Sequence, residues 1–321
     1  MKKTRVFVAG HNGMVGSALV HFLKKKKGIE IITKNRKDLN LTNQLEVQDF
    51  FKNKKIDQIF IAAGKVGGIK ANILKPGEFI YENLMIQTNI IHAAFLNKIK
   101  KLLYISSSCV YPKFSKQPIK EEALLGGTLE KSVEPYAISK IAGIKLCEAY
   151  NNQFSKKYMI DYRSIVPNNL YGPGDNYDLE NSHVVAALLR KFHDAKEKKK
   201  SEVVVWGNGK PLREFLYLDD FINSCFFMMN IDKKFLKKKI DSSYVNVGSG
   251  KEISIIELAL MIKKIVKFNG LIKFDTSKPN GALRKFLNTS KIRKLGWKPK
   301  VSLFKGLSKT YKNFKNTTLE C

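Results

Sequence analysis

Cysteine is scarce in this chain of 321 residues, and its four copies lie far apart. No two of them form a CxxC pair, which argues against a structural zinc site, a disulfide scaffold or any other metal centre built on cysteine. Long apolar runs are missing too, since none approaches the ~20 residues needed to cross a bilayer. The apolar stretch after the first lysines is too short for a signal peptide and leads directly into a glycine motif. We therefore expect a cytoplasmic protein without a membrane segment.

Acidic residues are few relative to basic ones. The chain has 28 Asp and Glu against 58 Lys and Arg, which gives a formal net charge of +30 at pH 7. Such a charge can indicate nucleic-acid binding. The lysines, however, occur in short runs in separate segments, without interleaved aromatic residues or an arginine-rich face. We therefore expect a solvated basic surface, which attracts small polyanions, and no nucleic-acid partner.

Strand-like and helix-like segments alternate through the first half of the chain, which predicts βαβ units. The strand-like segments are continuous apolar runs, as is typical of parallel strands covered on both faces. We predict an α/β fold, a doubly wound parallel sheet of the Rossmann type with a smaller, mixed α/β C-terminal substrate domain. Strands are expected at 5–9, 29–33, 57–62, 101–106 and 159–165, and helices at 13–26, 43–53 (capped by Thr42), 78–97, 135–157 and from Asn181 or Ser182 to about 199.

Gly10, Gly13 and Gly16 follow the first expected strand and open the first helix. Glycines at this place bring backbone N–H groups close to a pyrophosphate, which the helix N-terminus also attracts. After the second strand, NAD enzymes usually place an acid for the ribose 2′-hydroxyl. Here Lys34 and Arg36 occur instead, and a guanidinium suits a 2′-phosphate. We predict NADP(H) as the cofactor; the alternative is that these two cations are ordinary loop charges.

The predicted domains follow from these elements. Residues 1–169, with a return segment at about 216–247, are expected to form the NADP-binding Rossmann domain. Residues 170–215 and 248–321 are expected to form the smaller domain over the carboxyl ends of the strands, where ligands of such sheets bind.

Tyr136 and Lys140 share one face of the helix expected at 135–157. An ammonium near a phenol lowers the tyrosine pKa, so the pair predicts proton exchange with a hydroxyl or carbonyl during hydride transfer. Cys109 lies just after a strand that ends in serines, where a thiol can remove a proton next to a ketone; the alternative is a buried, inert cysteine. His183 near a helix start can supply the matching acid, although a lone histidine there is usually polar surface.

The most specific pattern is a set of segments spread collinearly along the chain. They include AGHNGMVGSA (9–18), IAAGKVGGIKAN (61–72), SSCVYPK (107–113), EPYAISKIAGIKLCEAYN (134–151), NNLYGPGDN (168–176), NSHVVAALLRKF (181–192) and VVVWGNGKPLREFLYLDD (203–220). Together they resemble the GDP-L-fucose synthase family of extended short-chain dehydrogenases/reductases. The resemblance implies that GDP-4-keto-6-deoxy-D-mannose is inverted at carbons 3 and 5 and then reduced by NADPH at carbon 4.

The resemblance also implies roles for individual residues. Cys109 and His183 exchange protons at carbons 3 and 5, while Tyr136, supported by Lys140 and Ser107, protonates the oxygen on carbon 4. It implies a homodimer, with the helices around 78–97 and 135–154 as candidate contacts. The residues it places at the nucleotide-sugar are Lys191, Trp206, Arg213 and Asn280. Those it places at NADP(H) are Gly10, Gly13, Met14, Val15, Gly16, Arg36, Asn40, Leu41, Ala63, Ser106, Lys140, Pro167, Asn169, Leu170 and His183.

Three positions depart from the family pattern and leave the choice of sugar open. Asn12 stands where an arginine is common, Lys191 where the family can carry arginine, and Asn280 where an aspartate is expected. One alternative is another extended-family nucleotide-sugar epimerase, reductase or dehydratase. A more remote one is a non-catalytic basic Rossmann protein that binds nucleic acid, which would be free to lose the catalytic residues.

Overall fold

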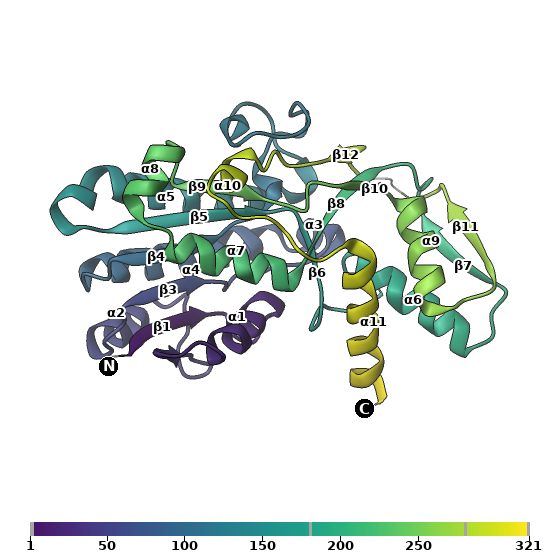
Figure 1. Cartoon of the computed structure of the whole chain (residues 1–321), viewed down its shortest axis with the longest axis horizontal. Helices are drawn as coiled ribbons and strands as arrows, with labels where there is room; N and C mark the ends of the chain where they lie inside the picture. The colour runs from purple at the N-terminus through teal and green to yellow at the C-terminus, as the bar shows by residue number, and fades with distance from the viewer. Residues whose placement is uncertain (1–2, 180–181, 279–280, 320–321) are drawn as a thin grey trace.

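Six parallel strands form the central sheet of the protein, which a computed structural model describes at residues 3–179, 182–278 and 281–319. In the strand order β2-β1-β3-β4-β5-β9, β2 lies on one side of β1 and the later strands follow on its other side, as in a doubly wound sheet (Figure 1). The strands are β1 (Thr4–Ala9), β2 (Ile29–Ile32), β3 (Gln58–Ile61), β4 (Lys101–Ile105), β5 (Asp161–Pro167) and β9 (Tyr244–Val247). The predicted parallel sheet is therefore confirmed.

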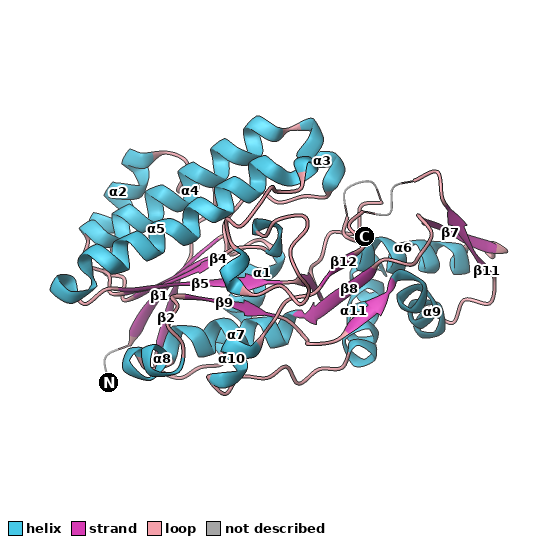
Figure 2. Ribbon diagram, turned by 90° about the horizontal axis from the view of Figure 1, so that it is seen from above, coloured by secondary structure: helices cyan, strands magenta, loops and turns pink. Residues whose placement is uncertain are grey.

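Alternate residues of each strand supply the cores on the two faces of the sheet. In β1, Val6 and Val8 point to one face, and Phe7 and Ala9 to the other. α1 (Met14–Lys24) and α7 (Leu218–Asn230) cover the face of Val6 and Val8, which we call the first face. α2 (Gln44–Asn53), α4 (Pro76–Leu96) and α5 (Glu134–Tyr158) cover the second face, that of Phe7 and Ala9. Figure 2 shows α2, α4 and α5 on one side of the sheet and α7 on the other.

A second group of strands and helices follows the central sheet. β8 (Leu212–Tyr217) pairs in parallel with β6 (Asn169–Tyr171) and β12 (Arg284–Lys285), and antiparallel with β10 (Glu252–Ser254). Their core contains Leu189, Phe192, Leu258, Ile262 and Leu307. The other elements here are α6 (Val184–Glu197), β7 (Glu202–Trp206), α9 (Ile255–Val266), β11 (Leu271–Asp275) and α11 (Leu303–Leu319). The shorter helices α3 (Ile69–Leu74), α8 (Lys233–Lys239) and α10 (Ser290–Lys294) flank the central sheet, and α10 packs on its first face.

Two expected helix caps are wrong. Asn43, not Thr42, caps α2, because its side chain accepts from the N–H groups of Leu45 and Glu46. α6 starts after His183, which occupies the cap position without a side-chain bond to the helix. Within the described ranges, no helix combines the length and apolar character that crossing a membrane requires.

Candidate active site

The glycine loop forms a cradle at the carboxyl end of β1. Gly10 has a φ of +82°, and a Cβ there would lie 2.6 Å from the Ala63 backbone. A Cβ at Gly16 would lie 2.0 Å from the Gly10 carbonyl oxygen, whereas one at Gly13 would meet nothing closer than 3.6 Å. The loop can therefore close tightly on itself and on the end of β3, while Gly13 leaves room above the N-terminus of α1. That room is what a pyrophosphate needs.

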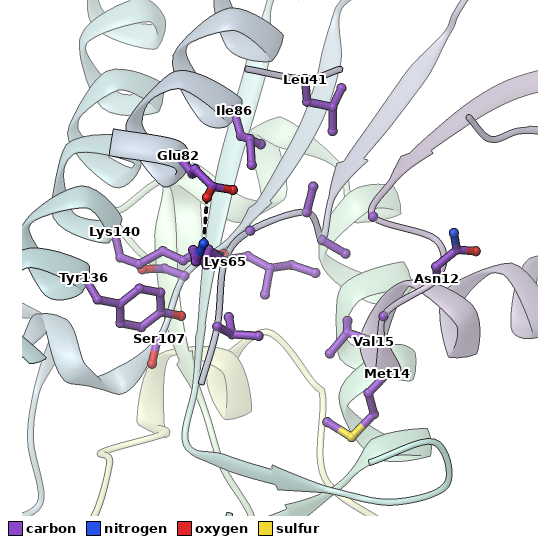
Figure 3. A pocket seen from close by; sticks show the side chains of 18 of the residues that line it. Asn12, Met14, Val15, Leu41, Lys65, Glu82, Ile86, Ser107, Tyr136 and Lys140 are labelled. Carbon is purple, nitrogen blue, oxygen red and sulfur yellow. Dashed lines mark hydrogen bonds and ion pairs between the residues drawn. The ribbon is translucent and has the colours of Figure 1, made fainter. Parts of the chain in front are cut away.

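A cleft of about 530 Å³ opens over this cradle, and Figure 3 shows part of its lining. Gly16, one of the residues expected at the cofactor, lies behind the loop and acts on its shape. The other expected residues do line the cleft, and they are Gly10, Gly13, Met14, Val15, Arg36, Asn40, Leu41, Ala63, Ser106, Lys140, Pro167, Asn169, Leu170 and His183.

α5 brings Tyr136 and Lys140 to the end of β4, beside Ser107. The Lys140 ammonium donates to the Ile105 carbonyl at 3.1 Å and lies 5.8 Å from the centre of the Tyr136 ring. The Ser107 hydroxyl hydrogen-bonds to the Tyr136 phenol. All three residues line the cleft. The structure thus brings together the serine, tyrosine and lysine that the sequence singled out (Figure 3).

Burial dominates the electrostatics of this group. It raises the pKa of the Tyr136 phenol, as does the nearby Cys109, and the Ser107 bond offsets only part of the rise. Burial also lowers the pKa of Lys140 to about 8, against the opposing effect of Cys109. The expectation that the ammonium lowers the tyrosine pKa is therefore wrong here. The phenol keeps its proton at neutral pH, which suits a proton donor.

Ser106 adds an unused hydroxyl to the cleft. Its Oγ is buried and has no hydrogen-bond partner within the described part of the chain, although buried hydroxyls normally have one. The open cradle at a helix N-terminus fits a pyrophosphate, and the cations Lys34 and Arg36 at the other end fit a phosphate on the ribose. The residues present therefore fit a phosphorylated dinucleotide.

Cys109 lies next to the serine, in the 3₁₀ turn η1 (Ser108–Val110). Its backbone N–H donates to the Ser107 Oγ at 3.5 Å, and its thiol is half-buried. Burial raises the pKa of the thiol, while the positive charge of Lys285 acts in the opposite direction more strongly than any other group. Lys285 is not expected from the sequence, because β12 reaches the site only by pairing with β8, with Lys285 opposite Arg213.

His183 reaches the cleft from the start of α6, on an exposed side chain. Asp175 lies near this imidazole: burial raises the pKa of its carboxyl, and His183 lowers it in part. One Asp175 oxygen is buried and has no hydrogen-bond partner among the described residues. The carboxyl and the imidazole therefore lie close enough to interact.

Three residues expected at the nucleotide-sugar, Lys191, Trp206 and Arg213, lie outside the lining of this cleft. The Lys191 ammonium donates to the Val204 carbonyl at 3.0 Å and sits 5.1 Å from the Trp206 ring centre. Trp206 exposes half of its surface. Burial lowers the pKa of Arg213, which faces Lys285 across the β8–β12 pair. Asn280 lies outside the described residues.

Two further charged residues of the cleft, Glu82 and Lys65, were not expected from the sequence. Glu82 comes from α4 and pairs with both Arg36 and Lys65. No motif contains this acid, and only the packing of α4 beside the β2 and β3 loops reveals its position.

Comparisons with known proteins place this architecture in a family. The model of the NAD dependent epimerase/dehydratase family matches residues 6–248. The chain is 49% identical to the GDP-L-fucose synthase of Escherichia coli K12, over 98% of this chain and 97% of that protein. It is also 49% identical to GDP-L-fucose synthase 1 of Arabidopsis thaliana, over 97% of this chain and 93% of that protein. A solved structure of a GDP-mannoheptose C4 reductase from Campylobacter jejuni with NADP bound has a TM-score of 0.88 and 38% identity, covering 98% of this chain and 99% of its own.

The fold and the serine, tyrosine and lysine at its cleft define an extended short-chain dehydrogenase/reductase. The chain belongs to the NAD dependent epimerase/dehydratase family. The resemblance read from the sequence is confirmed at this level.

Proposed function

We propose that this protein is a bifunctional, NADPH-dependent epimerase/reductase that converts GDP-4-keto-6-deoxy-D-mannose to GDP-L-fucose. One observation carries the proposal: Cys109 lies beside Ser107, Tyr136 and Lys140, and these three neighbours line a cleft that fits a phosphorylated dinucleotide, whereas Cys109 itself is just behind the lining. A ketone held there meets a thiol for carbon-acid chemistry and a phenol for reduction. The similarity to curated GDP-L-fucose synthases supports the same reaction.

The reductive half of the reaction relies on Tyr136. NADPH, when bound, supplies the hydride for carbon 4. The phenol donates its proton to the oxygen on that carbon, and Ser107 holds the oxygen beside it. The Lys140 ammonium then stabilises the phenolate left behind, and the phenolate regains a proton from solvent. The raised pKa of Tyr136 keeps this proton in place until the oxygen becomes basic.

The epimerising half relies on Cys109 and His183. The ketone acidifies carbons 3 and 5, so a thiolate can remove a proton from one face of the sugar and an imidazolium can return one to the other. Lys285 favours the thiolate at Cys109, and His183 lies near the buried carboxyl of Asp175. Each inversion consumes and returns one proton, so no net redox change occurs in this half.

Lys191, Trp206, Arg213 and Asn280 are proposed to hold the nucleotide-sugar. Lys191 and Arg213 suit a diphosphate, and the exposed Trp206 face offers a surface for the base or sugar. These residues belong to the proposed substrate domain, residues 170–215 and 248–321. The proposed NADP domain comprises residues 1–169 and 216–247, which together contain the whole central sheet.

We also propose that the protein works as a cytoplasmic homodimer without a nucleic-acid partner. α4 and α5 are the proposed dimer contacts, since both helices carry exposed apolar side chains, among them Tyr81, Leu96 and Ile138.

A second candidate function is reduction at carbon 4 without epimerisation. The Campylobacter C4 reductase is similar over nearly the full chain, and Lys191 and Asn280 leave the choice of sugar open. The two functions are separated by mixing the protein with NADPH and GDP-4-keto-6-deoxy-D-mannose and following reduced nicotinamide by absorbance. Oxidation that yields GDP-L-fucose supports the first function. Oxidation that yields only an uninverted sugar supports the second, and no oxidation contradicts both.

A further inference from the structure

A chain of ion pairs crosses the end of the cleft where the β2 loop supplies its cations. Arg36 Nη2 lies 3.6 Å from Glu82 Oε2, and Lys65 Nζ lies 2.7 Å from Glu82 Oε1. Lys65 also pairs with Glu78 on the same helix. Figure 3 shows Glu82 and Lys65 facing each other inside the cleft. These ion pairs thus connect the loop after β2, the helix α4 and the loop after β3.

Glu82 is the fixed member of this chain. Its side chain is 18% exposed, against 77% for Arg36. Lys65 holds the carboxylate firmly, and its own pKa is raised by bonds to Glu78 and Glu82, so it stays charged. Arg36 is the exposed partner, and it lines the cleft, where it can contact Glu82 or a ligand.

Glu82 reduces the positive charge that this end of the cleft offers to a ribose phosphate. Lys34, Arg36 and Lys65 line it with three positive charges and Glu82 with one negative charge, which leaves a net charge of +2, while Glu78 lies outside the lining and pairs with both Lys65 and Lys75. A phosphate monoester carries about −1.5 to −2 at neutral pH.

Asn12 adds no charge to this end of the cleft. Its side-chain amide donates to the Asn35 side chain at 3.1 Å, in the loop that also carries Lys34 and Arg36. Because Glu82 pairs with Arg36 and Lys65, the positive charge of these two residues is only partly available to a 2′-phosphate.

We propose that Glu82 sets the cofactor preference of this protein, by competing with the 2′-phosphate for Arg36 and by repelling that phosphate. The inference rests on the proposed NADP(H) function of the cleft. It predicts that the preference for NADPH over NADH is smaller than Lys34 and Arg36 would give without Glu82. Glu82 itself, rather than the loop that carries Arg36, limits the preference for the phosphorylated cofactor.

The test measures dissociation constants for NADPH and NADH by calorimetry, on the wild type, Glu82→Gln and Glu78→Gln. Glu78→Gln is the matched control: it removes one charge from the same Lys65, and among the described ion pairs Arg36 contacts Glu82 alone. For Glu82→Gln we expect NADPH to bind roughly five to ten times more tightly, because one negative charge near a phosphate is removed, with this gain shrinking at high salt.

For the same variant we expect NADH to change by less than about twofold, and the control to change both constants by less than about twofold. Weaker NADPH binding by Glu82→Gln, or an equal change for both cofactors, would overturn the inference and make Glu82 a support for Arg36. If the wild type binds neither dinucleotide, the proposed function fails first and this inference fails with it. If the wild type binds NADPH and only Glu82→Gln departs from expectation, the proposed function stands and the inference alone is wrong.

Discussion

Glu214 is the buried charge whose removal we expect to cost the protein most. It is fully buried in β8, and its carboxylate accepts from three segments: Asn168 Nδ2 at 2.6 Å, the Gly250 N–H at 2.6 Å and the Leu287 N–H at 3.3 Å. Asn168 precedes a residue of the cleft, and Leu287 follows Lys285 by two positions. One carboxylate therefore fastens the end of β5, the turn after β9 and the strand β12.

The size of the effect follows from these bonds. In Glu214→Gln, the amide oxygen can still accept from Asn168 and from the Leu287 N–H, which share one carboxylate oxygen in the wild type. Each of these bonds is then neutral and weaker by about 1 kcal/mol than a bond to a charged group. The amide nitrogen then faces the Gly250 N–H, which loses its acceptor at a cost of about 1–3 kcal/mol. Since burial raises the pKa of Glu214, removal of the charge returns part of this energy. We expect a net loss of about 2–4 kcal/mol in the free energy of unfolding.

Urea unfolding followed by circular dichroism measures this loss. The control is Glu252→Gln, which breaks a partly exposed ion pair with Arg284 and should cost less than about 1 kcal/mol. Equal unfolding midpoints for Glu214→Gln and the control would refute the reasoning, because the three donors would then contribute nothing beyond a surface pair.

Three other predictions concern the cleft. Gly16→Ala should abolish tight dinucleotide binding, measured by calorimetry, because the added Cβ would lie 2.0 Å from the Gly10 carbonyl oxygen. The control Gly77→Ala should bind normally, because its Cβ would have no atom within 4 Å. Normal binding by Gly16→Ala would contradict the role of the glycine loop as a pyrophosphate cradle. The reduction rate should fall as the pH rises through about 8, where Lys140 loses the proton that supports the Tyr136 phenolate, and a flat stopped-flow profile from pH 6 to 9.5 would contradict this role. Lys285→Gln should slow proton exchange at the sugar on the order of tenfold near neutral pH, because the positive charge that most favours the Cys109 thiolate is removed. The exchange rate is measured by NMR, and an unchanged rate would show that Lys285 has no role in this step.

Much of the fold could be predicted from local patterns. The first strand of the central sheet contains a continuous apolar run, and Val6 to Ala9 pack on both faces as such a run implies. β5 and β9 carry buried polar residues, among them Arg163 and Asn246, and are less typical of such strands. The helix caps were less predictable, because Thr42 and Asn43 are both good caps and only the backbone geometry selects between them.

The candidate site, too, contains residues that local patterns predict and residues that only the tertiary structure brings in. Tyr136 and Lys140 are one helical turn apart, so the sequence alone places them together. Lys285 and Glu82 reach the site through strand pairing and helix packing over long sequence separations, which no local motif encodes. The pKa of Tyr136 was misjudged because burial depends on the whole surrounding fold, and here it outweighs the neighbouring charge.

The most direct test of the central claim is proton exchange at the sugar without reduction. The protein is incubated with GDP-4-keto-6-deoxy-D-mannose in D₂O, in the absence of NADPH, and the sugar is examined by NMR beside a Cys109→Ser variant. We predict that the wild type incorporates deuterium at carbons 3 and 5 and that the variant does so far more slowly. No deuterium at either carbon, in a protein that still oxidises NADPH with this substrate, would contradict it and leave a carbon-4 reductase.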